Sequence, residues 1–416
     1  MHDKSVISEN SLANDQNISG NSLPKEQWVE EWTDRIKKIK SRCARCLYDV
    51  TVPNIAFDGK GICNYCQTHD LLEMQYPSGE SGYKRLEQIA LKIKQENANK
   101  PYDVIVGVSG GCDSSYMLYL TKKLGLRPLA VHFDNTWDTT IAVENIHTIL
   151  KKLNIELFTY VVDNEEYDDI YKSFFKSGVP DIDIPTDIAL ATTLNIAAEK
   201  YKIRYIFEGH SFRTEGIAPL GWIYMDGKYI ESIQKKYGTL KMESFPNLWL
   251  SSQLKWMILN RIKKIRPLWY IDYQKEKVKE FLANEFGWKW YGGHHLENRF
   301  THFAVTYFYP RRFGIDIRLL GCSALIRSKQ LSREEGLNLI LQPPSFDPEL
   351  IQLFKKRLNL TDDEFEYYMT RPIRSYKDFK TYKPLFEKFR PFFWLMAKMD
   401  LIPMSFYLKY TSKNNI

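Results

Sequence analysis

The stretch that most constrains the fold is 102–124, where an apolar run, a turn with two glycines and a helical pattern follow one another. The run YDVIVGV is rich in β-branched residues, which favour strands. Further strand patterns follow at 128–133, 156–162 and 204–207, and helical patterns lie at 140–153 and 187–200. Strands and helices alternating at this spacing predict an α/β fold, a parallel sheet with helices on both faces.

The turn after the first strand has the composition of a phosphate-binding loop. Its residues are Ser109, Gly110, Gly111, Cys112, Asp113, Ser114 and Ser115. Amide groups at the start of a helix attract an anion, and glycines let the main chain approach it. The serines add hydroxyl donors, and Asp113 can hold Mg²⁺ that bridges phosphate oxygens. The turn is neither a Walker A loop nor GxGxxG, and the alternative is a purely structural turn.

Four cysteines form two CxxC pairs, with sixteen residues between the pairs. They are Cys43, Cys46, Cys63 and Cys66. Two thiolate pairs at this spacing can converge tetrahedrally on Zn²⁺, which would make a closed structural site with no open coordination position. An iron–sulfur cluster or a redox dithiol is the alternative.

The remaining patterns divide the chain into four predicted segments. We expect a leader and a short helix over 1–40, a zinc module over 41–75, an ATP-binding domain over 76–300 and a mainly helical region over 301–416. Further helices are predicted at 26–40, 83–94, 251–264, 274–286 and 330–341.

Composition limits the class and the location of the protein. Hydrophobic residues make up 44% and charged residues 26% of the 416 residues, which is ordinary globular usage. Apolar stretches are interrupted too often for a membrane span, and the first residues lack the apolar block of a secretory signal. We therefore expect a soluble cytoplasmic protein whose cysteines are thiols or metal ligands.

The net charge of +7 comes from the C-terminal segment 371–416, which has ten basic and three acidic residues. This segment is also rich in aromatic residues. Such a combination can mark an anionic partner, either nucleic acid, a nucleotide-linked substrate or an acidic membrane surface. The alternative is a solvated helix face over an aromatic core.

The full SGGxDSS pattern between a strand and a helix resembles the signature of the pyrophosphate-loop ATPases, of the adenine nucleotide alpha hydrolase-like fold. The resemblance implies cleavage of ATP between its α and β phosphates and adenylation of a carbonyl-type oxygen. Nitrogen or sulfur then displaces AMP.

Several motifs in order resemble the N-acetyl sugar amidotransferase family of surface-polysaccharide biosynthesis, such as that of O-antigen and lipopolysaccharide. They are the cysteine module, the loop, the acidic VDNEEYDDIYKSFFKSGVPDIDIPTD, FEGHSFRTEGI and WYGGHHLENRFTHF. The resemblance implies that ATP activates an acetamido oxygen of a nucleotide-linked or related sugar. Ammonia then replaces AMP and leaves an acetamidino group.

The resemblance also assigns roles to the loop residues. It implies pyrophosphate binding by Ser109, Gly110, Gly111, Ser114 and Ser115. Asp113 would hold Mg²⁺, and Asp134, at the end of the second strand, would approach the adenosine.

A Gly-His motif after the fourth strand contains Gly209, His210 and Glu215. The resemblance implies that His210 contacts the α-phosphate and that Glu215 binds a second magnesium or the incoming nitrogen. Their alternatives are a helix-cap glycine, an interior histidine and a surface carboxylate. The later loop offers His294, His295 and Arg299 to the substrate.

The chain contains no cysteine in the setting of a glutaminase nucleophile. It begins Met1-His2, Cys112 lies inside the loop, and Cys322 is isolated. We therefore expect a partner glutaminase, which the resemblance implies to be similar to the imidazole glycerol phosphate synthase pair.

Two other functions stay open at this point. A tRNA-thiolating enzyme would share the loop, the paired cysteines and a basic segment able to follow RNA phosphates. The cysteines look committed to one another, however, which makes a nucleic-acid partner the less favoured reading. A non-catalytic zinc scaffold on a degenerate nucleotide-binding domain is the other alternative.

Overall fold

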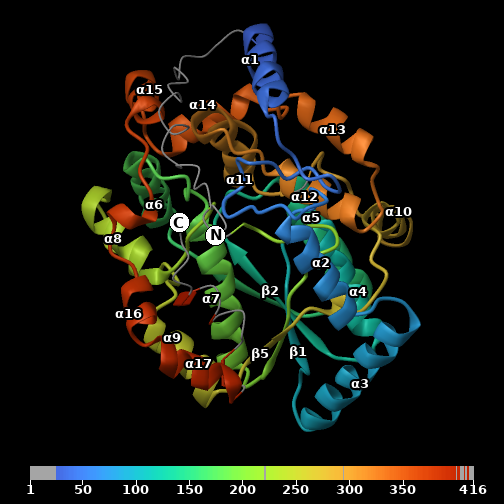
Figure 1. Cartoon of the computed structure of the whole chain (residues 1–416). Helices are drawn as coiled ribbons and strands as arrows, with labels where there is room; N and C mark the ends of the chain where they lie inside the picture. Colours follow the sequence, from blue (N-terminus) through green and yellow to red (C-terminus); the bar gives the residue numbers. More distant parts are fainter. Residues whose placement is uncertain are drawn as a thin grey trace.

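The computed structural model describes residues 25–219, 222–293, 295–399, 401–402, 407 and 410–411. Within them, five strands form one parallel sheet in the order β3-β2-β1-β4-β5 (Figure 1). The strands are β1 (Val104–Gly107), β2 (Pro128–Asp134), β3 (Leu157–Val161), β4 (Tyr205–Phe207) and β5 (Lys263–Ile265). The parallel α/β sheet predicted from the sequence is confirmed.

Helices cover both faces of the sheet, because alternate residues of each strand point to opposite sides. Val104 and Val106 of β1 pack in a cluster with side chains of α3 (Glu80–Glu96), α4 (Cys112–Lys123), α5 (Thr140–Leu153) and α10 (Lys275–Phe286). Ile105 lies on the other face, in a cluster with Ala197 and Ala198 of α7 (Ile184–Lys200).

One predicted helix differs from the structure, and one helix was not predicted. The helix expected at 251–264 is shorter: α9 (Leu250–Leu254) continues as a π-helical turn, Lys255–Leu259, and the chain then becomes strand β5. Arg261 has a φ of +52°, which a helix does not accommodate, and Lys263 to Ile265 pair with β4 at the sheet edge. The acidic stretch after β3, given no element from the sequence, contains α6 (Asn164–Ser177).

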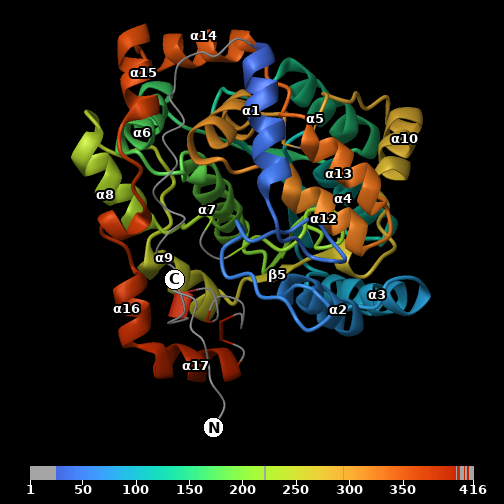
Figure 2. The same ribbon diagram turned by 45° about the horizontal axis from the view of Figure 1, so that its top comes forward.

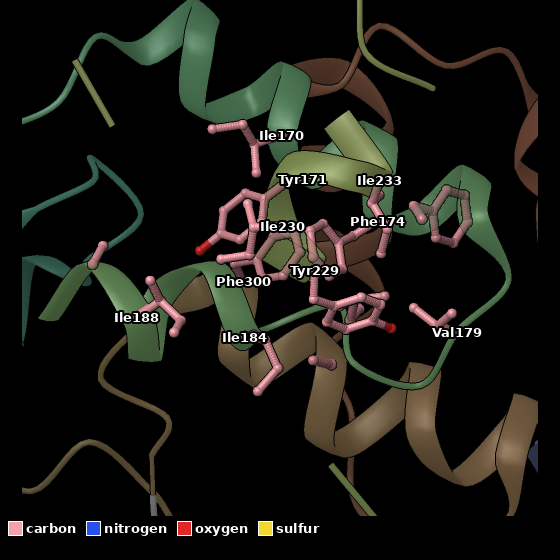
Figure 3. Packing of buried hydrophobic residues seen from close by; sticks show 14 of the residues in the cluster. Ile170, Tyr171, Phe174, Val179, Ile184, Ile188, Tyr229, Ile230, Ile233 and Phe300 are labelled. Carbon is pink, nitrogen blue, oxygen red and sulfur yellow. The ribbon is translucent and has the colours of Figure 1, made fainter. Parts of the chain in front are cut away.

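A second core, rich in aromatic rings, lies beside the sheet (Figure 3). Tyr171 and Phe174 of α6 meet Tyr229 of α8 (Gly227–Tyr237) and Phe300 of α11 (Arg299–Phe303). The Tyr171 and Phe300 rings are stacked with their planes 5° apart. This packing joins the segment after residue 297 to the sheet domain.

The C-terminal region is mainly helical, as predicted. Its elements include α12 (Arg318–Arg327), α13 (Arg333–Leu341), α14 (Pro348–Arg357), α15 (Asp362–Thr370), α16 (Lys383–Lys388) and α17 (Arg390–Lys398), and a π-helical stretch, Ala304–Phe313, leads into them. The first helix, α1 (Lys25–Lys38), runs beside α13, and Trp32 Nε1 donates to the Ile340 carbonyl at 2.9 Å (Figure 2).

The cysteine module and α2 (Asn64–Gln75) pack against the C-terminal region. Leu47 N–H donates to Ser323 Oγ of α12 at 3.2 Å, and Tyr48 OH donates to the Ile217 carbonyl at 3.1 Å. The division of the chain into four segments stays a prediction. Among the described residues, no helix combines the length and the hydropathy that crossing a bilayer requires.

Candidate functional site

The site lies where the strand order reverses direction. Strand β1 pairs with β2 on one side and β4 on the other, so the chain after β1 leads to one half of the sheet and the chain after β4 to the other. Ligands of parallel α/β sheets bind at such a point. A Cβ on Gly209, which follows β4, would lie 3.6 Å from the main chain of Asp113. The two predicted loops therefore meet.

Gly110 is required by the shape of the loop. Its φ is +76°, and a Cβ at this position would lie 2.2 Å from the Ala142 carbonyl oxygen. Its own carbonyl accepts hydrogen bonds from Trp288 Nε1 at 3.0 Å and Asn145 Nδ2 at 3.2 Å. These contacts hold the turn against α5 and the segment after α10.

The serines of the loop face one another across the turn. Ser109 Oγ lies 3.3 Å from Ser114 Oγ, and Gly111 N–H donates to Ser109 Oγ at 3.3 Å. Helix α4 begins at Cys112 without a side-chain cap. Its first-turn amides therefore lie at the positive end of the helix dipole, beside two hydroxyl groups, which is a suitable site for a phosphate.

Asp113 is paired with groups that the motifs had not indicated. Lys275 Nζ donates to Asp113 Oδ2 at 2.8 Å, and Tyr273 OH donates to Oδ1. Burial raises the pKa of Asp113, but the charge of Lys275 outweighs burial and holds this pKa below its usual range. Asp113 is therefore ionised and offers carboxylate oxygens to a cation.

Two further predicted residues have shifted pKa values. Burial, together with the charge of Asp113, raises the pKa of Glu215 to about 7. Burial lowers the pKa of His210 to about 4, so at pH 7 this ring is neutral and can serve a phosphate only as a hydrogen-bond donor. His210 Nδ1 is buried and has no hydrogen-bond partner among the described residues.

Glu297 lies directly over the phosphate loop. Its Oε1 accepts a hydrogen bond from Ser109 Oγ at 3.2 Å, and a Cβ on Gly111 would lie 3.0 Å from the same oxygen. Its Oε2 is buried and has no hydrogen-bond partner among the described residues. The segment around Glu297 therefore forms one wall of the site and offers it a carboxylate.

The other predicted residues are less closely tied to the loop. Asp134 Oδ1 accepts from Thr136 N–H at 2.8 Å and thus closes its own turn, while Ser115 is buried one turn into α4. Arg299 opens α11, and its N–H donates to the Trp137 carbonyl at 2.8 Å. His295 Nδ1 is 4.0 Å from Glu297 Oε1. His294 lies outside the described residues. The roles assigned to all site residues stay predictions.

Sequence reasoning missed Tyr273, Lys275 and Glu297. The first two stand at the start of α10 with no motif around them, and their contacts to Asp113 span 160 and 162 residues. Glu297 lies inside the motif WYGGHHLENRFTHF, from which only the histidines and the arginine were selected as candidates. Its position between two histidines and an arginine was the signal that could have marked Glu297 as a candidate.

The four cysteines form a compact buried group, as predicted. The Sγ atoms all lie within 4.8 Å of one another, with Cys43–Cys66 and Cys46–Cys63 both at 3.7 Å. Zn–S bonds of about 2.3 Å in a tetrahedron place neighbouring sulfurs about 3.8 Å apart. The donor set and its spacing therefore fit a zinc ion held by four thiolates.

A buried arginine completes this centre. Arg327 of α12 donates to Cys66 Sγ at 3.3 Å and to Cys46 Sγ at 3.1 Å, and its guanidinium stacks on the Tyr48 ring. Burial lowers the pKa of Arg327, but the Cys46 thiolate beside it reverses the effect and the pKa is raised. The positive charge offsets part of the negative charge that four thiolates bring to one metal ion.

The fold and these two sites define a parallel α/β protein with a loop suited to a phosphate at its switch point and a buried four-cysteine cluster suited to a metal ion. Residues 297–392 match the family model of the "LPS biosynthesis protein WbpG-like, C-terminal domain". This match confirms the expected resemblance to proteins of surface-polysaccharide biosynthesis, and its first residue, Glu297, contacts the phosphate loop.

Two kinds of protein are among the relatives with sequence similarity. An uncharacterized protein of Methanocaldococcus jannaschii is 24% identical over 321 residues, which cover 76% of this chain and 98% of that protein. The tRNA-specific 2-thiouridylase MnmA of Proteus mirabilis is 32% identical over 134 residues, covering 29% of this chain. The chain spans only about a third of the length of this thiouridylase, 36%.

Solved structures with some likeness include an NH3-dependent NAD synthetase from Campylobacter jejuni, which is 13% identical with a TM-score of 0.26. The match covers 70% of this chain and 98% of that one. An NMN synthetase from Francisella tularensis is 14% identical with a TM-score of 0.25, over 51% and 98% of the two chains. Scores this low carry no weight for the function.

Proposed function

We propose that this protein is an ATP-dependent synthetase of lipopolysaccharide or O-antigen biosynthesis that converts the N-acetyl group of a sugar into an acetamidino group. The observation that carries the proposal is the contact between Glu297 and Ser109. It joins the first residue of the segment similar to LPS biosynthesis proteins to the loop suited to a phosphate. The two features thus belong to one site.

The proposed reaction has two steps. In the first, the amide oxygen bonds to the α-phosphorus of ATP, the bond to pyrophosphate breaks, and the amide N–H loses its proton. In the second, the nitrogen of ammonia bonds to the activated carbon, the C–O bond breaks, and AMP leaves. Adenylation is needed because an amide carbon is a poor electrophile, whereas AMP is a good leaving group.

The residues of the site support these steps in distinct ways. The first turn of α4, with Ser109 and Ser114, would hold the pyrophosphate that leaves. Asp113 and Glu215 provide hard oxygen ligands for Mg²⁺, which would neutralise charge on the phosphates. Lys275 neutralises the charge of Asp113. It would also stabilise the negative charge that develops on the phosphates during the reaction. His210, neutral at pH 7, can donate one hydrogen bond to the α-phosphate.

Ammonia would come from a separate glutaminase subunit similar to the imidazole glycerol phosphate synthase pair. A glutaminase nucleophile must be a reactive thiolate. Burial raises the pKa of Cys112 to about 12 and that of Cys322 to about 11, so both are protonated at neutral pH. The remaining cysteines face one another in the metal centre.

Pyrophosphate release from ATP tests the proposal. The purified chain is assayed with a panel of nucleotide-linked N-acetyl sugars and either ammonium chloride or glutamine. We expect release and an amidino product with ammonium and none with glutamine. The Asp113→Asn variant, checked for zinc content and thermal stability, should lose turnover. Glutaminase activity in the isolated chain would contradict the need for a partner.

A second candidate is tRNA thiolation, which the similarity to the 2-thiouridylases favours. That chemistry needs a thiol able to carry sulfur to the adenylated base, and neither Cys112 nor Cys322 has the low pKa of such a thiol. The same assay with unmodified tRNA distinguishes the two functions. Pyrophosphate release with tRNA and with none of the sugars would favour thiolation.

A further inference from the structure

Helices α16 and α17 lie at the lower edge of the molecule in Figure 2. Several large apolar side chains of these helices and of the residues beside them are exposed. We define the apolar face as Leu385, Phe389, Phe392, Trp394, Leu395 and Met399. Each of these side chains is at least 40% exposed. A cluster of this kind on a soluble protein marks an interaction site.

The apolar face belongs to helices that are firmly attached to the protein. Phe393 and Met396 of α17 are buried in the aromatic core, and the Phe393 ring lies 5.2 Å from that of Phe386 in α16. Phe392, Leu395 and Met399, spaced by three and four residues, project from a neighbouring side of α17. The helix thus has one side for the core and another for solvent.

Basic residues outnumber acidic ones in the segment that carries the apolar face. Between residues 380 and 399 the chain has five basic residues, Lys380, Lys383, Lys388, Arg390 and Lys398, and one acidic residue, Glu387. Lys383 pairs with Glu387 at 3.1 Å, whereas Lys388 and Lys398 are exposed. Lys388 Nζ lies 5.8 Å from the Phe389 ring centre, and Lys398 Nζ lies 5.7 Å from that of Trp394. Positive charge therefore stands directly beside the exposed rings.

We propose that α16 and α17 dock the protein on the surface of an anionic lipid bilayer. Phenylalanine, leucine and methionine lie on one side of the short helix α17, and Trp394 with Lys398 lies on another exposed side. Such a helix suits the boundary between headgroups and acyl chains. The lysines would meet the negative headgroups. The helices would lie on the bilayer, because Phe393 and Met396 hold one side of α17 in the aromatic core.

Charge decides between lipid and a second copy of this chain. A symmetric contact through the apolar face would place Lys388 and Lys398 of two copies near one another, and like charges oppose such a contact. In an anionic bilayer, by contrast, the acyl chains would contact the rings and the negative headgroups would contact the lysines. The proposal uses none of the residues of the phosphate loop, and it does not depend on the proposed function.

Vesicle co-sedimentation of the full chain tests this docking. We expect binding to vesicles of phosphatidylcholine with a quarter phosphatidylglycerol, weak binding to pure phosphatidylcholine, and loss of binding as salt is raised. The double variants Phe392→Ser/Leu395→Ser and Lys388→Glu/Lys398→Glu should each bind at least tenfold more weakly. Brominated lipid should quench the tryptophan fluorescence of the unaltered chain more than that of Trp394→Phe, because Trp394 would lie in the bilayer surface.

Matched controls change similar side chains elsewhere. Leu71 is 65% exposed on α2, and Lys122 is exposed on α4, so Leu71→Ser and Lys122→Glu should bind vesicles like the unaltered chain. Absence of binding to anionic vesicles would overturn the proposal, as would equal binding by the double variants. Self-association lost in Phe392→Ser/Leu395→Ser, without vesicle binding, would assign the face to a second copy.

Discussion

The hydroxyl of Ser109 donates a hydrogen bond to the carboxylate of Glu297 at 3.2 Å, across 188 residues of sequence. A carboxylate thus occupies the neighbourhood in which a phosphate would be bound. Because two anions repel at short range, Glu297 must either move or share a cation with the nucleotide. A substitution at Glu297 should therefore change the affinity for ATP and the turnover rate in different ways.

Removal of this charge should have opposite effects on ATP binding and turnover. In Glu297→Gln we expect ATP to bind about fivefold more tightly without Mg²⁺, because a nearby negative charge is gone. Turnover should fall, since the neutral amide holds a cation more weakly than a carboxylate and is a far weaker base. Calorimetric titration and product formation measure the two effects. Glu285→Gln on the exposed side of α10 is the control, and unchanged or weaker ATP binding in Glu297→Gln would count against this role.

Gly110 and Gly287 offer a matched pair of glycines. Both have positive φ, +76° and +69°, but only at Gly110 would a Cβ strike the main chain, at Ala142. Gly287→Ala should cost about 1 kcal/mol of stability. Gly110→Ala should lose ATP binding at least tenfold and melt at a lower temperature than Gly287→Ala. Equal ATP affinity in the two variants would show that the loop does not hold the nucleotide.

Arg327 should strengthen the metal centre without binding metal itself. Loss of its two hydrogen bonds to Cys46 and Cys66 in Arg327→Met should lower zinc affinity by about 10- to 100-fold, as measured by competition with a chelator. Arg204→Met serves as the control, because Arg204 is exposed next to β4 and has no side-chain contact with the four cysteines in the described part of the chain. Zinc affinity that is equal in both variants would refute the role of Arg327.

The buried Asp181 should make stability depend on pH. Burial raises the pKa of Asp181 to about 7, although Tyr224 N–H and Tyr229 OH donate hydrogen bonds to it. The folded state therefore keeps a proton that the unfolded chain releases near pH 4. The free energy of unfolding should thus fall as pH rises from about 4 to about 7, by at most about 4 kcal/mol.

Asp181→Asn tests this pH dependence. Its melting temperature should fall less between pH 5 and pH 8 than that of the unaltered chain. Asp183, whose pKa burial also raises to about 7, adds a fall of the same sign in both proteins. Asp34→Asn on the exposed side of α1 should follow the unaltered chain. Parallel pH profiles for Asp181→Asn and the unaltered chain would contradict the assignment.

The sequence by itself determined the features that depend on neighbouring residues. The strand, turn and helix around Gly110 follow from residue types a few positions apart, and so do the two cysteine pairs. Most strands of the sheet, and most helices that cover it, were also predicted from local residue patterns. Strand β5 was missed because its partner β4 lies more than fifty residues earlier, and pairing at the sheet edge overrode a helical pattern.

Only the tertiary structure decided which distant groups complete the two sites. Lys275 and Glu297 reach the phosphate loop, and Arg327 reaches the thiolates, across 162, 188 and up to 281 residues. No local pattern encodes such contacts, because they follow from the packing of α10, α12 and the aromatic core against the sheet. The tertiary structure likewise decided which side of α17 is exposed, because the aromatic core buries Phe393 and Met396 on the other side.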